Sequence, residues 1–264
     1  MDSSDRKTVV AVVSDFKFLN SNFNKLYDQL RGHGNYQGEI LVITSKFSPC
    51  FLIKSIRKKN KVKVLRFKNI KFDKITEFEL NNLETYNDPN RNLTKKFQWH
   101  KLHLFDEFIK NWDYVFYLDI NMNIHSDINP ILALTPENCF MARSDTYPKY
   151  DRELKTQFDQ SHPAYLKLEK NYDLRVNDYF QTGVMYFDTT IISKHTKNQI
   201  IDLVNKYPIS KTNEQGTLNL YLYLQKKIYR ELPSKINGYT TYFYWKLNNE
   251  NIIITKQLTE PNKY

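Results

Sequence analysis

Glycine is scarce in this chain, with six glycines among 264 residues. None of them lies in residues 14–22 (SDFKFLNSN), which follow the first strongly apolar segment. Some nucleotide-binding enzymes, the sugar nucleotidyltransferases among them, need a glycine-rich loop at that point so that backbone N–H groups can approach a phosphate. The shortage therefore argues against that class of enzyme.

Cysteine is rarer still, with only Cys50 and Cys139. The two stand far apart and form no Cys-x-x-Cys or Cys/His spacing. This argues against a disulfide framework and against a cysteine zinc site. We predict two ordinary buried thiols, because a free cysteine usually behaves as a small apolar residue.

Long hydrophobic runs are also missing. The longest, residues 9–13 and 40–43, are far shorter than the roughly 18 residues that a membrane span needs. The first five residues, MDSSD, are acidic and polar, unlike a secretory signal. We therefore expect a cytoplasmic protein without a membrane span.

Apolar residues are nevertheless plentiful. Hydrophobic residues make up 41% of the chain and aromatic residues 15%, which is enough for a buried core and too much for a disordered chain. The length suits one large domain or two small ones. Because no repeat, low-complexity linker or shift in composition divides the sequence, we predict a single domain over residues 1–264.

Positive charge is in excess, with a formal net charge of +10. A basic surface attracts anions such as nucleic acid, anionic lipid or a phosphorylated small molecule. Basic residues are densest in residues 54–71, where they alternate with apolar ones. This pattern is typical of the solvated face of a helix and a strand. A nucleic-acid-binding surface is the alternative, although no recognised nucleic-acid-binding motif is present.

The first 70 residues alternate between β-branched runs and segments of helical spacing. We predict strands at residues 8–14, 39–44 and 61–67, and helices at residues 22–31 and 49–59. Strands that alternate with helices favour an α/β fold with a mainly parallel central sheet and helices on its faces.

The rest of the chain continues in the same style. We expect a polar loop at 81–92, an amphipathic helix at 97–110 and a buried strand at 114–118 (YVFYL). Further along, the sequence predicts strands at 139–142, 178–188, 229–232 and 239–245, helices at 193–206 and 212–225, and an irregular or partly helical insertion at 146–177.

Asp119 is the most informative single residue, because it directly follows the YVFYL strand. Ligands of open α/β sheets bind beyond the carboxyl ends of the strands. Two residues on, Asn121 points to the same side if the chain stays extended. Oxygens placed in this way suit Mn²⁺ or Mg²⁺, which would bind a diphosphate. The alternative is an aspartate that forms a turn or caps a helix.

His100 and His103, three residues apart on the predicted helix, form another possible metal pair. No matching carboxylate accompanies them, so we do not expect a metal there.

Several motifs occur in a fixed order around Asp119. They are KLH (101–103), YVFYLD (114–119), Asn121, SDINPIL (126–132), FQTGVM (180–185), NEQGTLN (213–219) and Leu232-Pro233 with Asn237. This series resembles the retaining glycosyltransferases related to glycogenin and the bacterial galactosyltransferases, glycosyltransferase family 8. The resemblance covers about residues 97–240 and implies the GT-A fold, a Rossmann-like three-layer α/β sandwich.

The resemblance also implies a reaction. A sugar would move from a nucleotide-diphosphate donor, usually a UDP-sugar, to a hydroxyl of a carbohydrate or glycoprotein acceptor, with retention at the anomeric carbon. Asp119 would ligate the metal, and Asn121 stands where the family has a second aspartate. Ser14 and Asp15 would lie near the base or ribose of the donor. A simple loop is the alternative for these two residues.

The same resemblance assigns roles near the sugar. Lys101 would lie near the donor phosphates or sugar, unless it is only a solvated helix lysine. Gln181 and Thr182 would hydrogen-bond the transferred sugar, or else form a polar strand face. Gln215 and Glu214 would line the reacting face of the sugar. The alternative is that Asn213 caps a helix and that Glu214 and Gln215 lie in its first turn.

The sequence departs from the family at the metal. The family's third ligand is a histidine in a late His-x-x-Gly-x-x-Lys-Pro-Trp segment, whereas the last histidine here is His195. The alternatives are a metal that binds weakly, one that needs the nucleotide, one that uses another ligand such as an Asn or Asp elsewhere, and no metal at all. In the last case Lys101 or another cation would stabilise the leaving diphosphate. The aromatic run at 239–245 would pack in the core or shape the acceptor site. A non-catalytic nucleotide-sugar-binding relative is the alternative function.

Overall fold

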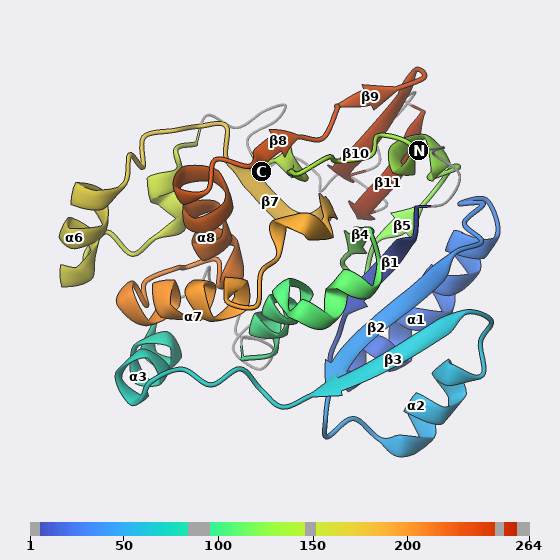
Figure 1. Cartoon of the computed structure of the whole chain (residues 1–264), viewed down its shortest axis with the longest axis horizontal. Helices are drawn as coiled ribbons and strands as arrows, with labels where there is room; N and C mark the ends of the chain where they lie inside the picture. The colour runs from blue at the N-terminus through green and yellow to red at the C-terminus, as the bar shows by residue number, and fades with distance from the viewer. Residues whose placement is uncertain (1–5, 84–95, 146–151, 246–250, 258–264) are drawn as a thin grey trace.

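A seven-stranded sheet forms the centre of the molecule, with the strand order β3-β2-β1-β4-β7-β6-β8 (Figure 1). The computed structural model describes residues 6–83, 96–145, 152–245 and 251–257. The strands of this sheet are β1 (Thr8–Val13), β2 (Glu39–Ser45), β3 (Val62–Phe67), β4 (Tyr114–Leu118), β6 (Phe140–Ser144), β7 (Phe180–Asp188) and β8 (Tyr229–Glu231).

The sheet is mainly parallel, as the sequence predicts. Four of its strands, β1 to β4, are mutually parallel, and β6 is parallel to β8. Strand β7 is antiparallel to both of its neighbours, β4 and β6. The amino end of β7 therefore lies at the same edge of the sheet as the carboxyl ends of β1 and β4. This edge carries the candidate site.

Helices cover both faces of the sheet and form a three-layer sandwich, which confirms the predicted fold class. Alternate residues of β1 point to opposite faces. Val10 and Val12 pack in the core cluster that contains Leu19 and Phe23 of α1 (Phe16–Arg31), and α2 (Cys50–Arg57) lies on the same side. Val9 and Ala11 face the second cluster, which contains residues of η2 (Trp99–Phe105), α7 (Thr196–Lys206) and α8 (Glu214–Leu218).

A second, four-stranded sheet has the order β5-β11-β10-β9. Its strands are β5 (Asn123–Ile124), β9 (Lys235–Ile236), β10 (Tyr239–Trp245) and β11 (Ile252–Gln257). Strand β11 is parallel to β10 and antiparallel to β5. Since β5 begins four residues after Asp119, its pairing with β11 brings the end of the described chain next to the carboxyl end of β4.

Several helices differ from their predicted bounds. The helix predicted at 22–31 begins at Phe16, because the Asp15 side chain accepts from Phe18 N (2.9 Å) and caps it. The helix predicted at 97–110 is mostly two 3₁₀ segments, η2 and η3 (Glu107–Asn111), since Asp106 has extended backbone between them. The helix predicted at 212–225 is α8, followed by a π-helical turn, η6 (Asn219–Gln225).

The remaining elements are short. They are α3 (Lys74–Asn82), α5 (Asn129–Leu132), η4 (Leu154–Gln157), α6 (Pro163–Asn171) and η5 (Thr189–Ile191). Helix α3 was not predicted and takes the first residues of the loop expected at 81–92, while 84–92 lie outside the described residues. The insertion expected at 146–177 is partly helical where it is described, and 146–151 lie outside that part.

The cysteine prediction is half right. Cys139 is buried, as predicted, whereas Cys50 is exposed at the first position of α2; both thiols are free. None of the helices in the described part of the chain combines the length and apolarity of a bilayer span.

The basic stretch 54–71 covers α2 and β3. Several of its cations bind backbone carbonyls: Arg57 donates to Val64 O (3.1 Å), Lys61 to Gln37 O (3.0 Å) and Arg66 to Ser48 O (3.0 Å). These contacts connect neighbouring segments of the fold. They give three of the cations in this stretch a structural role.

Candidate active site

Asp119 lies at the carboxyl end of β4, where the chain leaves the sheet. Its N–H donates to Gly183 O of β7 (2.9 Å), and its own carbonyl accepts from Met122 N (3.0 Å). A Cβ on residue 183 would lie 2.9 Å from Met122 Cε and 3.5 Å from Asp119 Oδ2. The glycine of the FQTGVM motif thus lets the start of β7 pass close to the Asp119 carboxylate.

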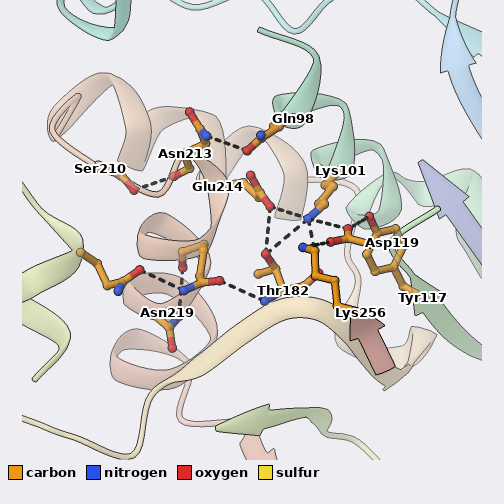
Figure 2. Close-up of polar contacts among 12 residues, drawn as sticks. Gln98, Lys101, Tyr117, Asp119, Thr182, Ser210, Asn213, Glu214, Asn219 and Lys256 are labelled. Atoms are coloured by element: carbon orange, nitrogen blue, oxygen red, sulfur yellow. Dashed lines mark hydrogen bonds and ion pairs between the residues drawn. The ribbon is translucent and has the colours of Figure 1, made fainter. Parts of the chain in front are cut away.

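Lys101 connects that carboxylate to a second one. It projects from η2, and its Nζ lies 3.1 Å from Asp119 Oδ1 and 2.7 Å from Glu214 Oε1 (Figure 2). It also donates to Thr182 O (3.3 Å) and Oγ1 (3.4 Å). The Lys101 side chain is 10% exposed, so the alternative of a solvated helix lysine is wrong.

Glu214 opens helix α8 and is almost fully enclosed. Its Oε1 accepts from Thr182 Oγ1 (2.9 Å), while its Oε2 is buried without a hydrogen-bond partner in the described part of the chain. The preceding residue, Asn213, has φ of 53°, a region that few non-glycine residues adopt. Hydrogen bonds to Gln98 (2.6 Å) and from Ser210 (2.6 Å) hold this turn (Figure 2).

Gln215 joins α8 to two other parts of the molecule. Its Oε1 accepts from Thr182 N (3.2 Å), and its Nε2 donates to Gln157 Oε1 (2.9 Å) and Asp145 Oδ2 (3.3 Å). One turn later, Asn219 bonds both the N–H and the carbonyl of Phe180 (2.9 and 2.8 Å). Helix α8 is therefore fixed against the start of β7, which positions Glu214 and Gln215.

Lys256, on β11, approaches Asp119 from the other side. Its Nζ lies 3.0 Å from Asp119 Oδ2, and Tyr117 OH donates to Asp119 Oδ1 (2.7 Å) (Figure 2). The Lys256 side chain is 26% exposed, compared with 17% for Asp119 and 2% for Glu214. Of this group, Lys256 is the most accessible to a ligand.

The ammonium groups of Lys101 and Lys256 keep the Asp119 carboxylate ionised. Burial alone raises the pKa of Asp119, but Lys101 and Lys256 outweigh burial and keep that pKa well below its usual range. Burial likewise opposes the charge of Lys101, whereas Asp119 and Glu214 raise its pKa above the usual range. At neutral pH the cluster therefore contains an ionised aspartate between two ammonium groups.

The structure brings together five of the residues predicted from the sequence: Lys101, Asp119, Thr182, Glu214 and Gln215. A sixth, Gln181, accepts from Tyr242 OH (3.0 Å). Tyr242 and Phe243 are buried, as expected of core aromatics, while the side chain of Trp245 lies outside the described part.

Ser14 and Asp15 follow β1 at the same edge of the sheet but do not join this cluster. Ser14 N donates to Ile43 O (3.0 Å), and the carboxylate of Asp15 caps α1. Their role toward a donor base or ribose stays a prediction.

Asn121 was expected to share a face with Asp119, and the reason for that expectation is wrong. Ile120 and Asn121 form a turn instead of extended chain, so the alternation of side chains does not apply. Asn121 is exposed, and no hydrogen bond joins it to Asp119 among the described residues.

The cluster also includes residues that sequence reasoning missed: Tyr117, Asp145, Gln157 and Lys256. Asp145 directly follows β6, as Asp119 follows β4, and burial raises its pKa. The pattern of an acid after a strand could have identified it. A β-branched run before Lys256 could likewise have revealed β11.

Gly216 is a close-packed position that fixes α8. A Cβ there would lie 2.5 Å from Ser210 Oγ and 3.1 Å from Phe158 Cε1. We expect Gly216→Ala to lower the free energy of unfolding by about 1–3 kcal/mol, the usual cost of overpacking, as measured by urea denaturation. Ser210→Ala alone also costs stability, because it removes the hydrogen bond to Asn213 O (2.6 Å), but it removes the nearest clashing atom too, so the double variant should lose less than the sum of the two single variants. Strictly additive effects of the two substitutions would contradict the packing.

Comparisons with known proteins identify the family of the chain and its fold. The profile of the family "Glycosyl transferase family 8" matches residues 8–259. The galactosyltransferase LgtC, solved in complex with donor and acceptor sugar analogs, superposes with a TM-score of 0.59 at 14% identity, over 89% of this chain and 75% of that one. A search of curated proteins finds no match.

Two eukaryotic enzymes share the fold. The mannosyltransferase Ktr4p from S. cerevisiae has a TM-score of 0.53 at 14% identity, over 89% of this chain and 72% of its own. Mouse xyloside xylosyltransferase 1 has a TM-score of 0.51 at 9% identity, over 95% and 97%. These likenesses show the GT-A fold. Because the family profile covers nearly the whole described sequence, the chain belongs to glycosyl transferase family 8 and is a glycosyltransferase.

Proposed function

We propose that this enzyme transfers a sugar from a nucleotide-diphosphate donor, with UDP as the nucleotide, to a hydroxyl of a carbohydrate or glycoprotein acceptor. The observation that supports this best is the cluster of Asp119, Lys101, Glu214 and Lys256 at the carboxyl edge of β4. Ligands of α/β sheets bind at this edge. Ammonium groups there suit the negative charge that develops on a departing diphosphate.

Different residues of the site bind different parts of the donor in this proposal. The donor diphosphate lies next to Asp119 and Lys256, where the side chains are most exposed. The transferred sugar lies against Gln181, Thr182 and Gln215. The nucleoside extends past the end of β1 toward Ser14 and Asp15, which share that edge of the sheet.

Glu214 has a further feature that suits a sugar. Its Oε2 is a buried acceptor with no partner in the described part of the chain, and an unpaired buried acceptor carries a free-energy cost. A sugar hydroxyl that donates to this oxygen would remove that cost. We propose that Glu214 and Gln215 orient the sugar through such contacts.

The reaction exchanges one bond at the anomeric carbon. The bond from this carbon to the diphosphate oxygen breaks, and a bond to the acceptor oxygen forms. If the acceptor attacks from the face that the diphosphate leaves, its hydroxyl proton passes to the departing diphosphate oxygen. Retention then requires no nucleophile from the protein.

The test is turnover with a panel of UDP- and GDP-sugars and simple glycoside acceptors. Released nucleotide is measured with Mn²⁺ and, separately, with EDTA, so that the result does not depend on the cation. We expect UDP release, with the anomeric configuration of the product read from its proton coupling constant. UDP binding without turnover would instead support a non-catalytic relative. Duplex or RNA binding with a steep salt dependence would support the nucleic-acid alternative.

A further inference from the structure

We propose that the Lys256 ammonium takes the place of the family's divalent metal, binding the donor diphosphate while Asp119 holds it, so that transfer needs no divalent cation. The inference rests on the proposed function and adds to it the identity of the cation.

The residues around Asp119 do not fit a metal. Both carboxylate oxygens are occupied: Oδ1 faces Lys101 Nζ and Tyr117 OH, and Oδ2 faces Lys256 Nζ. Two ammonium groups at about 3 Å repel a divalent cation, by Coulomb's law most strongly where water is excluded. Hard cations need several oxygen or imidazole ligands. In the described part of the chain, no three His, Cys, Asp or Glu side chains gather into such a set.

Lys256 has the features that the diphosphate needs from a cation. An ammonium group has three N–H donors. Within the described residues one of them bonds Asp119 Oδ2, which leaves two for phosphate oxygens. The side chain is a quarter exposed, so a ligand can reach it.

The fold fixes Lys256 in this position. Strand β11 pairs with β5 through Thr255 and Asn123, and Asn123 Nδ2 also donates to Lys256 O (3.2 Å). The Tyr244 ring lies 5.8 Å from Lys256 Nζ on the neighbouring strand β10. The ammonium is therefore held on a paired strand instead of a free loop.

Lys101 is less suited to meet the diphosphate. Its ammonium is surrounded by Asp119, Glu214 and Thr182, and its side chain is 10% exposed. It orients the carboxylates of Asp119 and Glu214 from the buried side of the cluster. We therefore class Lys101 as a positioning residue and Lys256 as the group that touches the substrate.

Replacing the metal and one carboxylate by Lys256 leaves the net charge of the site unchanged. A divalent cation on two carboxylates has a net charge of zero, and so does the single ammonium of Lys256 on the single carboxylate of Asp119. A neutral amide at Asn121 and a cation at 256 thus compensate each other. Lys256 donates hydrogen bonds to the phosphate oxygens throughout and transfers neither a proton nor electrons.

The first test removes divalent cations from the wild-type enzyme. With EDTA we expect nucleotide release within about twofold of the rate with Mn²⁺, and UDP binding by calorimetry that is equally insensitive to EDTA. Activity that EDTA abolishes and Mn²⁺ restores would overturn the inference while leaving the proposed function intact. Absence of turnover under both conditions would instead count against the proposed function.

The second test substitutes the lysine. In EDTA, Lys256→Met should weaken UDP binding at least tenfold and lower kcat/KM by about 10²–10³, the usual effect of losing one preorganised group that stabilises transition-state charge. Lys256→Arg should retain part of both. Lys235→Met is the matched control, because it removes the same charge from an exposed position in the same sheet, and it should leave both values unchanged.

Thermal unfolding of each variant checks that it is folded. Wild-type UDP affinity in a folded Lys256→Met variant would overturn the inference, and this readout does not require turnover.

Discussion

Asp119→Ala is expected to lower kcat/KM by about 10³-fold, the upper end of the effect of removing one preorganised charged or polar group. The substitution removes the anchor of Lys256 and leaves Lys101 paired with Glu214 alone. Nucleotide release at fixed donor concentration measures this loss, in EDTA and in Mn²⁺.

Asp127→Ala is the matched control for this prediction. Asp127 comes after the next strand, β5, is partly exposed and accepts from Asn129 N (2.8 Å), outside the cluster. We expect its removal to leave kcat/KM within about twofold, because a surface substitution away from the site usually has a small effect. Equal activity of Asp119→Ala and Asp127→Ala would contradict the catalytic role of the cluster.

Lys101→Met is expected to lower the free energy of unfolding by about 3–5 kcal/mol, the usual cost of removing one partner from a buried ion pair. The substitution leaves Glu214, whose side chain is 2% exposed, without a cation, and it removes one of the two ammonium groups on Asp119. Urea denaturation at pH 7 measures the change. Activity should fall as well, since Glu214 and Asp119 lose the group that orients them.

The effect of Lys101→Met should also depend on pH. The pKa of Asp119 is lower in the folded chain than its usual value, so the stability that its charge contributes is present above about pH 4, the usual aspartate pKa, and is lost as the pH falls through the folded-state pKa. We therefore expect the gap between wild type and variant to narrow below about pH 4.

Lys197→Met serves as the control for charge alone. Lys197, on α7, pairs with Asp106 near the surface, and both side chains are partly exposed. Its loss should cost less than about 1 kcal/mol, as for other surface pairs. An equal loss of stability in Lys101→Met and Lys197→Met would contradict the buried role of Lys101.

The fold could be predicted because its strands are strongly marked. The β-branched runs at β1 and β2 and the apolar YVFYL of β4 each identify a buried strand from sequence alone. Helix bounds were less accurate. The 97–110 segment has helical spacing, yet the Asp106 side chain accepts from Glu107 N and starts a second short 3₁₀ segment.

The candidate site was predicted to the extent that it lies in motifs. Asp119, Thr182, Glu214 and Gln215 occur in segments with a recognisable order, and the structure brings them together. Lys256 has no motif around it. Its contact with Asp119 depends on the pairing of β11 with β5, about 130 residues apart, and a long-range register of this kind is not encoded in local spacing.

Asn121, in contrast to Lys256, was assigned to the site from the sequence but does not contact Asp119 among the described residues. A two-residue spacing predicts a shared face only in extended chain, and the chain turns directly after Asp119, where Met122 N bonds its carbonyl. Asn121, which the sequence assigned to the metal, is therefore exposed on a turn. The Asp119 carboxylate instead pairs with Lys256, to which the sequence assigned no role.

The most direct measurement is a crystal structure of the enzyme with UDP, grown once in EDTA and once in Mn²⁺. We expect the diphosphate within hydrogen-bond distance of Lys256 Nζ in both crystals, with Asp119 still bonded to that lysine and no metal on the carboxylate. A Mn²⁺ ion on Asp119 that displaces Lys256, or a nucleotide bound away from the end of β4, would contradict this.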